Sequence, residues 1–487
     1  MSRLPDGFAV ALDGRARVLS GGAVVLGGSP MRLLRLAPAA RRLLAGRREL
    51  TVRDPTSAAL ARRLLDAGVA HPVVSGLGGP SEADVTVVVP VRDRPDGLRR
   101  LLAALDETAP GLAEVIVVDD GSASDARPVD SGAVRVRWIR HPRSLGPAAA
   151  RNTGLAAART EYVAFLDSDV VPLPGWLAPL RAHLADRSVA LVAPRIVALP
   201  GDGGWLDRYE RARSSLDLGP DPAPIVPRTR VAYVPSAALL ARRDALGDGF
   251  DPDLPVAEDV DLVLRLHAAG RRLRYEPSAL VAHCHRTAPL DWWTRKAFYG
   301  TGAAPLALRH PGSVPPAVFA PWAVAACLLL GTGRRPGMLA AAGLTAASAL
   351  RLRRTLGGWL PRPWPTAARL TGHGLRATAA QVAGLLVRHW WPLAVPACLI
   401  SRRIRRAALA AALAEGLVDW YTHRRDSGLD PVRYLLAHRA DDLAYGAGLW
   451  WGAWRGRTLA PLLPVITRPA REPRPPRRFP SSGPVSG

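Results

Sequence analysis

The chain has 487 residues, enough for two or three domains with hydrophobic cores of their own. Its three cysteines, Cys284, Cys327 and Cys398, show no paired or metal-ligand spacing, which argues against a disulfide framework or a zinc finger and favours a reducing compartment. The formal net charge is +24, and residues 301–487 hold 25 arginines against 7 acidic residues, an excess of 18. This charge suits anionic lipid head groups or nucleic acid, or a solvated basic face.

Residues 1–78 have a pattern of their own. Val18–Leu19 and Ala23–Leu26 predict two short strands joined by a Ser-Gly-Gly turn, an arrangement typical of a hairpin. Apolar residues then recur at helical spacing over 33–44 and 57–67. A hairpin followed by helices predicts a small winged-helix-like domain.

This first unit resembles the PqqD-like peptide-recognition domains of ribosomal-peptide modification enzymes, in its order of elements and in Gly27-Gly28-Ser29-Pro30 before the first helix. The resemblance implies a module that handles a peptide. Two other interpretations stay open, a DNA-binding winged helix and a structural cap. Clustered arginines suit the former, although no recognition helix with base-reading side chains is evident. A Gly- and Ser-rich linker, 75–83, follows.

Strands and helices alternate after the linker. Val115–Val118 is apolar throughout, as expected of a strand buried on both faces, and Asp119-Asp120-Gly121-Ser122 ends it. In open α/β sheets, the carboxyl edge of the strands is where ligands bind. The alternation predicts a parallel sheet with right-handed crossovers. Further strands are predicted at 85–91, 134–139 and 162–166, and helices at 97–106, 146–158 and 260–269.

Five motifs in this order resemble the inverting family 2 glycosyltransferases over about residues 84–290: the strand 85–91, Asp119–Ser122, Gly146–Gly154, Asp167-Ser168-Asp169 and Glu258-Asp259-Val260-Asp261. The resemblance implies an α/β protein with a GT-A nucleotide-sugar-binding domain and a mixed, mostly parallel sheet. A winged-helix-like domain precedes it, and a helical, partly membrane-associated region follows. The expected boundaries are 1–78, 84–300 and 301–467, with a disordered tail at 468–487.

A nucleotide-sugar donor carries a diphosphate, whose charge a divalent cation neutralises when the sugar is transferred. Asp167 and Asp169, two residues apart, face the same way at a strand end, and the resemblance makes them the family's Asp-X-Asp motif. Mg²⁺ or Mn²⁺ would suit such oxygen ligands. His283 matches the position of a further metal ligand in several relatives, although a histidine at a strand end is more often only hydrogen-bonded. Strand-end acids that are merely solvated are the alternative.

The resemblance also assigns residues to the nucleotide sugar. Asp120 would accept a hydrogen bond from the uracil imide, and Ser168 stands between the two metal-motif aspartates. Arg151 and Asn152 begin a helix beside this pocket, where a cation suits a phosphate, or where Arg151 packs its stem over the sheet edge. Pro90, Val91 and Arg92 would line the base and ribose pocket.

Inversion requires a base that deprotonates the acceptor hydroxyl, and a partly desolvated carboxylate suits this role. The resemblance points to Asp259, with Glu258 as the competing candidate, while Asp261 is open to a capping role at a helix N-terminus. Trp292-Trp293 suits either an aromatic platform for a sugar ring or an anchor at a membrane surface.

The C-terminal third contains three apolar stretches. Residues 314–333 carry no charge over about 20 residues, the length that spans a bilayer, whereas 337–350 is shorter. Residues 382–400 contain Arg388-His389, which is expensive at mid-membrane. One span, a re-entrant pair, interfacial helices and buried helices of a soluble domain remain open. The flanking arginines and an N-terminus without a signal-peptide pattern favour the cytoplasmic side of the cell membrane.

The three parts together most resemble the mycofactocin-system glycosyltransferases. This implies transfer of glucose from UDP-glucose to premycofactocin, a precursor derived from a ribosomal peptide, to form a β-linked chain. The implied partners are a UDP-sugar donor, the peptide-derived acceptor, the inner membrane surface and other enzymes of the pathway. A lipid or cell-wall glycan acceptor is the alternative. A nucleic-acid-binding winged-helix protein is the non-enzyme alternative, disfavoured because strand-edge acids repel phosphate.

Overall fold

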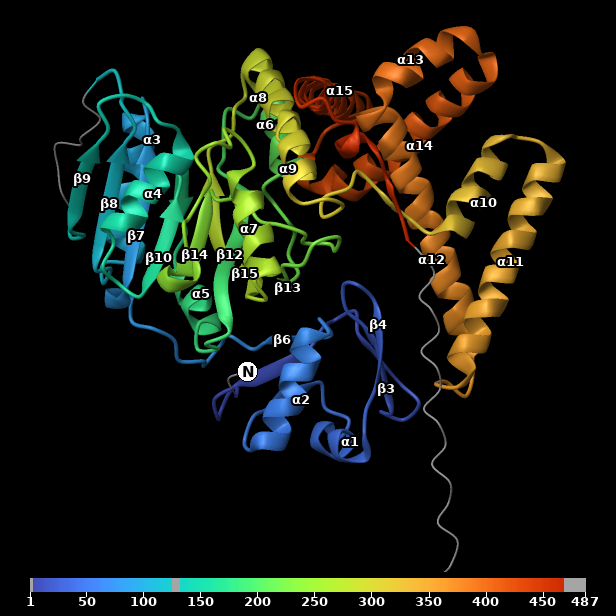
Figure 1. Ribbon diagram of the computed structural model, residues 1–487, viewed down its shortest axis with the longest axis horizontal. Coiled ribbons are helices and arrows are strands. Elements are labelled where there is room, and N and C mark those ends of the chain that lie inside the picture. Colours follow the sequence, from blue (N-terminus) through green and yellow to red (C-terminus); the bar gives the residue numbers. More distant parts are fainter. Residues whose placement is uncertain (1–2, 125–131, 468–487) are drawn as a thin grey trace, which may run out of the picture.

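The computed structural model describes residues 3–124 and 132–467, so the tail predicted at 468–487 lies outside the described residues (Figure 1). Three parts follow one another: an N-terminal module up to residue 77, an α/β domain and a helical region from residue 303. Figure 1 shows the N-terminal module beneath the α/β domain and the helical region beside it.

A nine-stranded sheet forms the centre of the α/β domain, in the order β11-β15-β12-β14-β10-β7-β8-β9, with β13 paired to β15. Strands β7 to β10 are mutually parallel neighbours, whereas β14 runs antiparallel to both β10 and β12. The mixed sheet is confirmed, but parallel pairings do not dominate it. The strands are β7 (Val85–Val91), β8 (Glu114–Asp119), β9 (Val136–Arg140), β10 (Tyr162–Leu166), β11 (Val170–Pro172), β12 (Val189–Ala198), β13 (Ala223–Pro224), β14 (Ala238–Arg242) and β15 (Arg272–His283).

Helices cover both faces of this sheet, which explains why its strands are apolar at consecutive positions. On one face, α3 (Pro95–Thr108) and α5 (Leu177–His183) pack their leucines against alternate valines of β7 and β8. On the other face, α4 (Pro147–Ala157) and α7 (Glu258–Ala268) pack against the intervening residues. A further helix, α6 (Trp205–Arg213), packs on the helical region.

The chain order creates a cleft between β7 and β10. From β7 the chain proceeds to β8 and β9, then returns to form β10 on the other side of β7. The loops after β7 and β10 therefore diverge, and this switch point is where open α/β sheets bind ligands. Gly97 in α3 lets the helix approach this edge, because a Cβ there would lie 2.5 Å from the carbonyl oxygen of Ser168.

The N-terminal module contains the predicted hairpin and the predicted second helix. The helix predicted at 33–44 is wrong in its first part, because 32–35 pairs as a strand with β3. The winged-helix assignment stays a prediction. The elements are β1 (Ala9–Leu12), β5 (Glu49–Thr51) and β6 (Ala70–Pro72) in one sheet, β2 (Arg17–Leu19), β3 (Val24–Gly27) and β4 (Arg32–Arg35) in another, and helices α1 (Pro38–Leu44) and α2 (Pro55–Asp66).

Ion pairs attach this module to the α/β domain, and two of them are bidentate. Arg62 of α2 binds both carboxylate oxygens of the buried Asp186, with nitrogen–oxygen distances of 2.5 and 2.9 Å. Asp66, one helical turn on, binds Arg272 of β15 in the same bidentate manner at 2.7 and 2.9 Å. The planar guanidinium favours this geometry, which fixes the orientation of the module as well as its position.

The helical region contains no helix, within the part of the chain that the structure describes, that is long and apolar enough to cross a membrane alone. Residues 314–333 contain a short strand and an 11-residue helix, too short for the single span that was one of the open interpretations. One pair of helical segments, 363–389 and 391–400, is together long and apolar enough to span a membrane, but the pair is bent by 91°. Helix α8 (Pro289–Thr301) closes the α/β domain and leads into this region. The elements of the region are α9 (Ala303–Arg309), β16 (Val318–Phe319), α10 (Pro321–Gly331), α11 (Arg335–Gly357), α12 (Pro363–Gly384), a π-helical turn (Leu385–His389), α13 (Trp391–Ile400), α14 (Arg402–Ser427), α15 (Pro431–Arg455) and β17 (Val465–Ile466).

Glycines bring α15 into backbone contact with α8. A Cβ at Gly448 would lie 1.7 Å from the carbonyl oxygen of Ala297, and one at Gly452 would lie 2.6 Å from that of Thr301. Only glycine permits this approach. Because α8 follows directly from the sheet, this contact fixes α15 against the α/β domain.

We expect Gly448→Ala to lower the melting temperature, because the added methyl group forces the two helices apart at a cost of about 1–3 kcal/mol. Gly343→Ala is the matched control, since a Cβ at that position in α11 meets no atom within 4 Å. Calorimetric melting of both variants measures the difference. Equal melting temperatures would contradict the contact.

Candidate active site

A cavity of about 1150 Å³ lies at the carboxyl edge of the sheet, between the α/β domain and the helical region. It exceeds the 300–1,000 Å³ typical of a single small-ligand site, as expected where two substrates meet. Nearly all of the residues predicted for the site line this cavity. They are Pro90, Val91, Arg92, Asp120, Arg151, Asp167, Ser168, Asp169, Glu258, Asp259 and His283.

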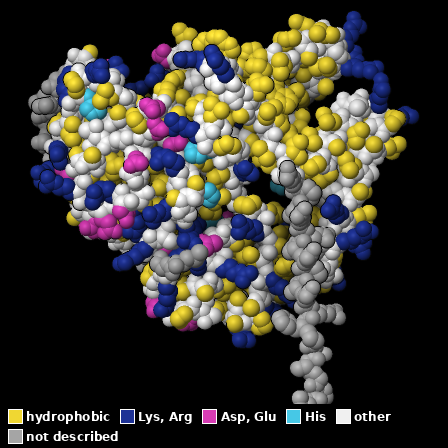
Figure 2. Space-filling model, viewed as in Figure 1, with side chains coloured by type: hydrophobic (Ala, Val, Ile, Leu, Met, Phe, Trp, Pro, Cys, Tyr) yellow, Lys and Arg dark blue, Asp and Glu magenta, His cyan; other side chains and the backbone are white. Residues whose placement is uncertain are grey.

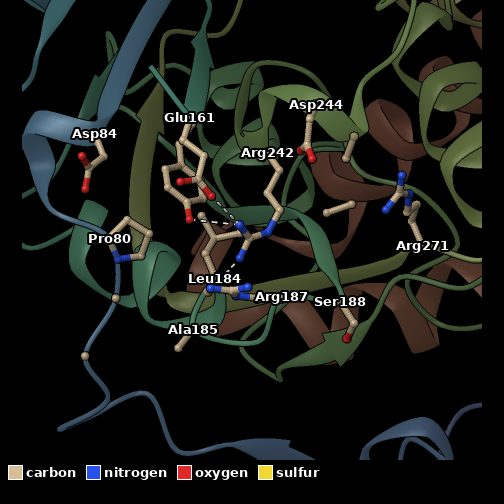
Figure 3. A pocket seen from close by; sticks show the side chains of 15 residues that line it. Pro80, Asp84, Glu161, Leu184, Ala185, Arg187, Ser188, Arg242, Asp244 and Arg271 are labelled. Carbon is tan, nitrogen blue, oxygen red and sulfur yellow. Dashed lines mark hydrogen bonds and ion pairs between the residues drawn. The ribbon is translucent and has the colours of Figure 1, made fainter. Parts of the chain in front are cut away.

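A second cavity, of about 650 Å³, lies at the opposite edge of the sheet (Figure 3). Three arginines line it, and Arg242 is used by the fold: it binds Glu161 at 2.9 Å and the hydroxyl of Tyr162 at 3.0 Å. The same guanidinium donates to the carbonyl oxygens of Leu184 and Val189. These contacts tie strand ends together. Because the residues predicted for the site line the larger cavity, we place the functional site there.

Asp167, Asp169 and His283, the predicted metal ligands, line the same cavity. Nε2 of His283 lies 3.6 Å from a carboxylate oxygen of Asp169, because β11 and β15 pair next to the aspartate loop. Burial lowers the pKa of His283, which keeps the imidazole neutral and leaves a nitrogen lone pair available. Two carboxylates and a neutral imidazole are ligands that suit a divalent cation such as Mn²⁺. The residues present therefore fit the predicted metal.

Arg151 connects the two acidic parts of the cavity. Its guanidinium lies 2.6 Å from Asp167 and 2.8 Å from Glu258, and stacks 5.3 Å from the ring centre of Phe250. Burial alone would lower the pKa of Arg151, but the two carboxylates raise it above its ordinary value. In this arrangement the arginine neutralises one acid that follows β10 and one from α7, while its contact with a phosphate stays a prediction.

Asp259 is the carboxylate at the start of α7 that lacks an arginine partner among the described residues. It accepts hydrogen bonds from the backbone N–H groups of Ser236, at 3.0 Å, and Val260, at 2.8 Å. Burial, followed by the neighbouring charge of Glu258, raises the pKa of Asp259 to about 6. Because Glu258 is bound to Arg151, Asp259 is better placed to accept a proton.

Asp261 faces away from these residues. Its carboxylate binds Arg265 at 2.7 Å and His310 at 2.8 Å. Helix α7 begins at Glu258 and is preceded by Ala257, with no side-chain cap. The capping role considered for Asp261 is therefore wrong.

Asp120 organises the loop after β9. Its carboxylate oxygens accept four hydrogen bonds, from His141 and the backbone N–H of Leu145 on one oxygen and from Ser144 and the backbone N–H of Gly146 on the other. These donors occupy the usual acceptor positions of a carboxylate. The contact with a uracil imide stays a prediction, and it requires one of these donors to be displaced.

Two predicted residues, Asn152 and Trp292, lie outside the cavity, as does His285, two residues after His283. The side chain of Asn152 binds both backbone groups of Phe250, at 2.6 and 2.8 Å, and does not line the cavity. His285 binds Asp207 at 2.8 Å, so the two histidines do not act together. Trp292 is buried and donates to Glu210, which removes it as a sugar platform.

Two groups of cavity residues were not predicted. Arg94 binds Asp169 at 2.7 Å, and its place two residues after Arg92 in the loop following β7 is the signal that was available. Arg388 and Tyr445 come from the helical region. No local pattern marks them, because they reach the cavity only through the packing of α15 on α8.

Comparisons with known proteins show which family the chain belongs to. The model of glycosyl transferase family 2 matches residues 86–249. A pre-mycofactocin glycosyltransferase of Mycobacterium tuberculosis is 51% identical over 474 residues, covering 96% of this chain and 99% of the relative. The succinoglycan biosynthesis protein ExoU of Rhizobium meliloti is 30% identical over 39% of this chain and 59% of its own length.

Solved structures overlap with the chain in part. A mannosyltransferase from Pyrobaculum calidifontis, in complex with GDP-Man and Mn²⁺, superposes with a TM-score of 0.36 at 20% identity, over 63% of this chain and 90% of that one. GalNAc-T7 with UDP, GalNAc and Mn²⁺ gives a TM-score of 0.34 at 20% identity, over 45% of each chain. The match to the mycobacterial enzyme extends over both chains almost completely. The chain therefore belongs to the pre-mycofactocin glycosyltransferases of glycosyl transferase family 2.

Proposed function

We propose that this protein transfers glucose from UDP-glucose to premycofactocin with inversion at the anomeric carbon, building a β-linked glucose chain. One observation carries the proposal: a single cavity contains both a potential metal-ligand group and Asp259, whose pKa is raised to about 6. The full-length similarity to pre-mycofactocin glycosyltransferases supports the acceptor. It also supports a place beside the other enzymes of the same modification pathway.

A divalent cation held by Asp167, Asp169 and His283 would neutralise the diphosphate as it leaves. The cavity's own residues prepare this position. Arg94 orients Asp169 through their 2.7 Å contact. Arg151 fixes the carboxylates of Asp167 and Glu258 through its hydrogen bonds to both.

Asp259 accepts the proton of the acceptor hydroxyl in the proposed reaction. The hydroxyl oxygen forms a bond with the anomeric carbon from the face opposite UDP, and the bond from that carbon to the phosphate oxygen breaks. Its electron pair leaves with UDP, so the sugar inverts its configuration. The hydrogen bonds from Ser236 and Val260 fix the orientation of Asp259 during this step.

The N-terminal module favours a peptide-derived acceptor over a lipid or a cell-wall glycan. Its bidentate ion pairs hold the module in a fixed position on the α/β domain, so the module is an integral part of the enzyme. A peptide-handling module has no evident use in an enzyme that only extends a glycan.

We expect Asp259→Asn to lower turnover by about 10²–10⁴-fold, since the amide cannot accept the hydroxyl proton. The measurement combines UDP release with mass spectrometry of premycofactocin, using UDP-glucose and Mn²⁺. Wild type should add one or more hexoses, and EDTA should abolish the addition. UDP binding should stay within twofold in the variant. Asp253→Asn, an exposed acid before α7, is the control. Full turnover by Asp259→Asn would exclude it as the base.

The pH dependence follows from the same carboxylate. Above about pH 6, Asp259 is ionised and can accept a proton, whereas below that pH it is increasingly protonated. We expect kcat/KM to be level above pH 6 and to fall about tenfold for each pH unit below it. Initial rates at saturating Mn²⁺ between pH 5 and 8 test this. A level profile down to pH 5 would contradict the role of Asp259.

We also infer that the enzyme attaches to the surface of an anionic phospholipid bilayer at the cytoplasmic side. Figure 2 shows hydrophobic side chains gathered over the helical region. In α13 no side chain is buried, and Leu399 and Ile400 are 78% and 89% exposed. Arg402, Arg403, Arg405 and Arg406 follow at once and are all exposed. An apolar helix next to basic residues suits a position in the plane of a membrane interface, with the arginines at lipid phosphates.

Vesicle flotation tests the attachment. Wild type should float with vesicles of phosphatidylglycerol and phosphatidylcholine, less so with phosphatidylcholine alone. Replacing the four arginines in the first turns of α14 by glutamine should weaken binding, because each contributes about 1 kcal/mol near an anionic surface. The control replaces four exposed arginines of the α/β domain, Arg99, Arg100, Arg135 and Arg159. Equal flotation of both variants would contradict this surface.

A further inference from the structure

The active-site cavity continues past Asp259 into an inner chamber, which two separate parts of the chain enclose. The α/β domain supplies Tyr233, Phe298 and Tyr299, and the helical region supplies Arg388 and Tyr445. We use the name inner chamber for the space between these five residues. The five residues line the same cavity as Asp259.

Tyr233 occupies the position between the base and the helical wall. Its side chain is 40% exposed toward the cavity. Burial within the cleft raises the pKa of Tyr233 to about 12, with further contributions from the nearby Tyr445 and Asp259. The phenol is therefore neutral at physiological pH, and its O–H is available to donate a hydrogen bond to a ligand beside Asp259.

The opposite wall is held rigidly by charge. The guanidinium carbon of Arg388 lies 4.2 Å from the ring centre of Tyr445. Arg388 donates to Asp442 at 3.0 Å and to Asp441 at 3.4 Å, and Lys296 lies 3.6 Å from Asp441. The positive charge is thus neutralised inside the protein, and the Tyr445 ring keeps a fixed orientation.

Backbone contacts hold this wall on the catalytic side. Arg388 lies in the π-helical turn after α12, and a Cβ at Gly446 would lie 2.2 Å from its carbonyl oxygen. The contact between Gly448 and α8 fixes α15 in turn. The helical region is therefore part of the substrate site as well as a candidate membrane anchor.

We propose that the inner chamber binds the acceptor through a flat, hydroxylated ring, which packs against Tyr445 and receives a hydrogen bond from Tyr233 while its reacting hydroxyl faces Asp259. This inference rests on the proposed glycosyl transfer. An aromatic face binds either a phenol-like ring of the aglycone or the outer sugar of an acceptor that already carries glucose. The paired charges and hydroxyl groups of the walls disfavour a long apolar tail, which would leave them without water.

Calorimetric titration of the UDP-loaded, Mn²⁺-loaded enzyme tests the chamber without relying on turnover. The two ligands are premycofactocin and its monoglucosylated form. The variants are Tyr445→Ala, which removes the ring face, and Tyr233→Phe, which removes only a hydroxyl group. We expect each to raise the Kd for an acceptor about tenfold or more, with the Kd for UDP within twofold. Trp454→Ala is the control, since this 70% exposed ring on the same helix does not line the cavity.

The two ligands distinguish the source of the ring. Weaker binding of premycofactocin itself places the aglycone ring on Tyr445, whereas weaker binding of the monoglucosylated form alone places the sugar there, and either result supports the chamber. Acceptor Kd values within twofold of wild type for both variants and both ligands would overturn it. Failure of the proposed function is a separate result, namely no hexose transfer by wild type.

Discussion

The contact of Arg151 with Asp167 and Glu258 is the interaction on which the active site depends. Two acids from distant parts of the chain converge at the sheet edge, and without a shared cation they would repel one another in a partly desolvated cleft. The guanidinium lies between them at 2.6 and 2.8 Å and sits against Phe250. Because Glu258 is held in this way, its neighbour Asp259 is left as the ionisable group that faces the acceptor side.

The same arrangement separates two electrostatic tasks within one cavity. The acids of the β10 loop, together with His283, suit a cation and the diphosphate that it would neutralise. Asp259 stands beyond the arginine, where burial weakens its acidity and so makes it a better proton acceptor. Arg151 keeps these tasks apart, since it lies between Asp167 and the start of α7.

Local sequence patterns predicted the sheet and much of the site, because each catalytic motif ends or begins a regular element. The strands at 85–91 and 162–166 match the structure residue for residue, since unbroken apolar runs bounded by acids leave little freedom in assigning them. The sequence could not show where the side chains of Asn152 and Trp292 point. The orientation of a side chain on a helix depends on its tertiary partners, which here are Phe250 and Glu210. From the sequence, Arg388 is a charge that disfavours a membrane span. In the structure it is paired with Asp441 and Asp442, which lie 53 and 54 residues further along the chain.

Helix α8 joins the two ends of the active site. It begins at Pro289, shortly after His283 at the end of β15, and its Ala297 touches the backbone of α15 at Gly448, three residues after Tyr445. His283, a candidate metal ligand, and Tyr445, a residue of the inner chamber, are therefore connected through one short, closely packed helix. Substitutions on the cavity face of α15 can change acceptor preference alone, whereas a change in the length of the 284–288 connection would displace both sites together. Side-chain substitutions can change acceptor preference and donor chemistry separately. Both nevertheless depend on the same backbone contact between α8 and α15.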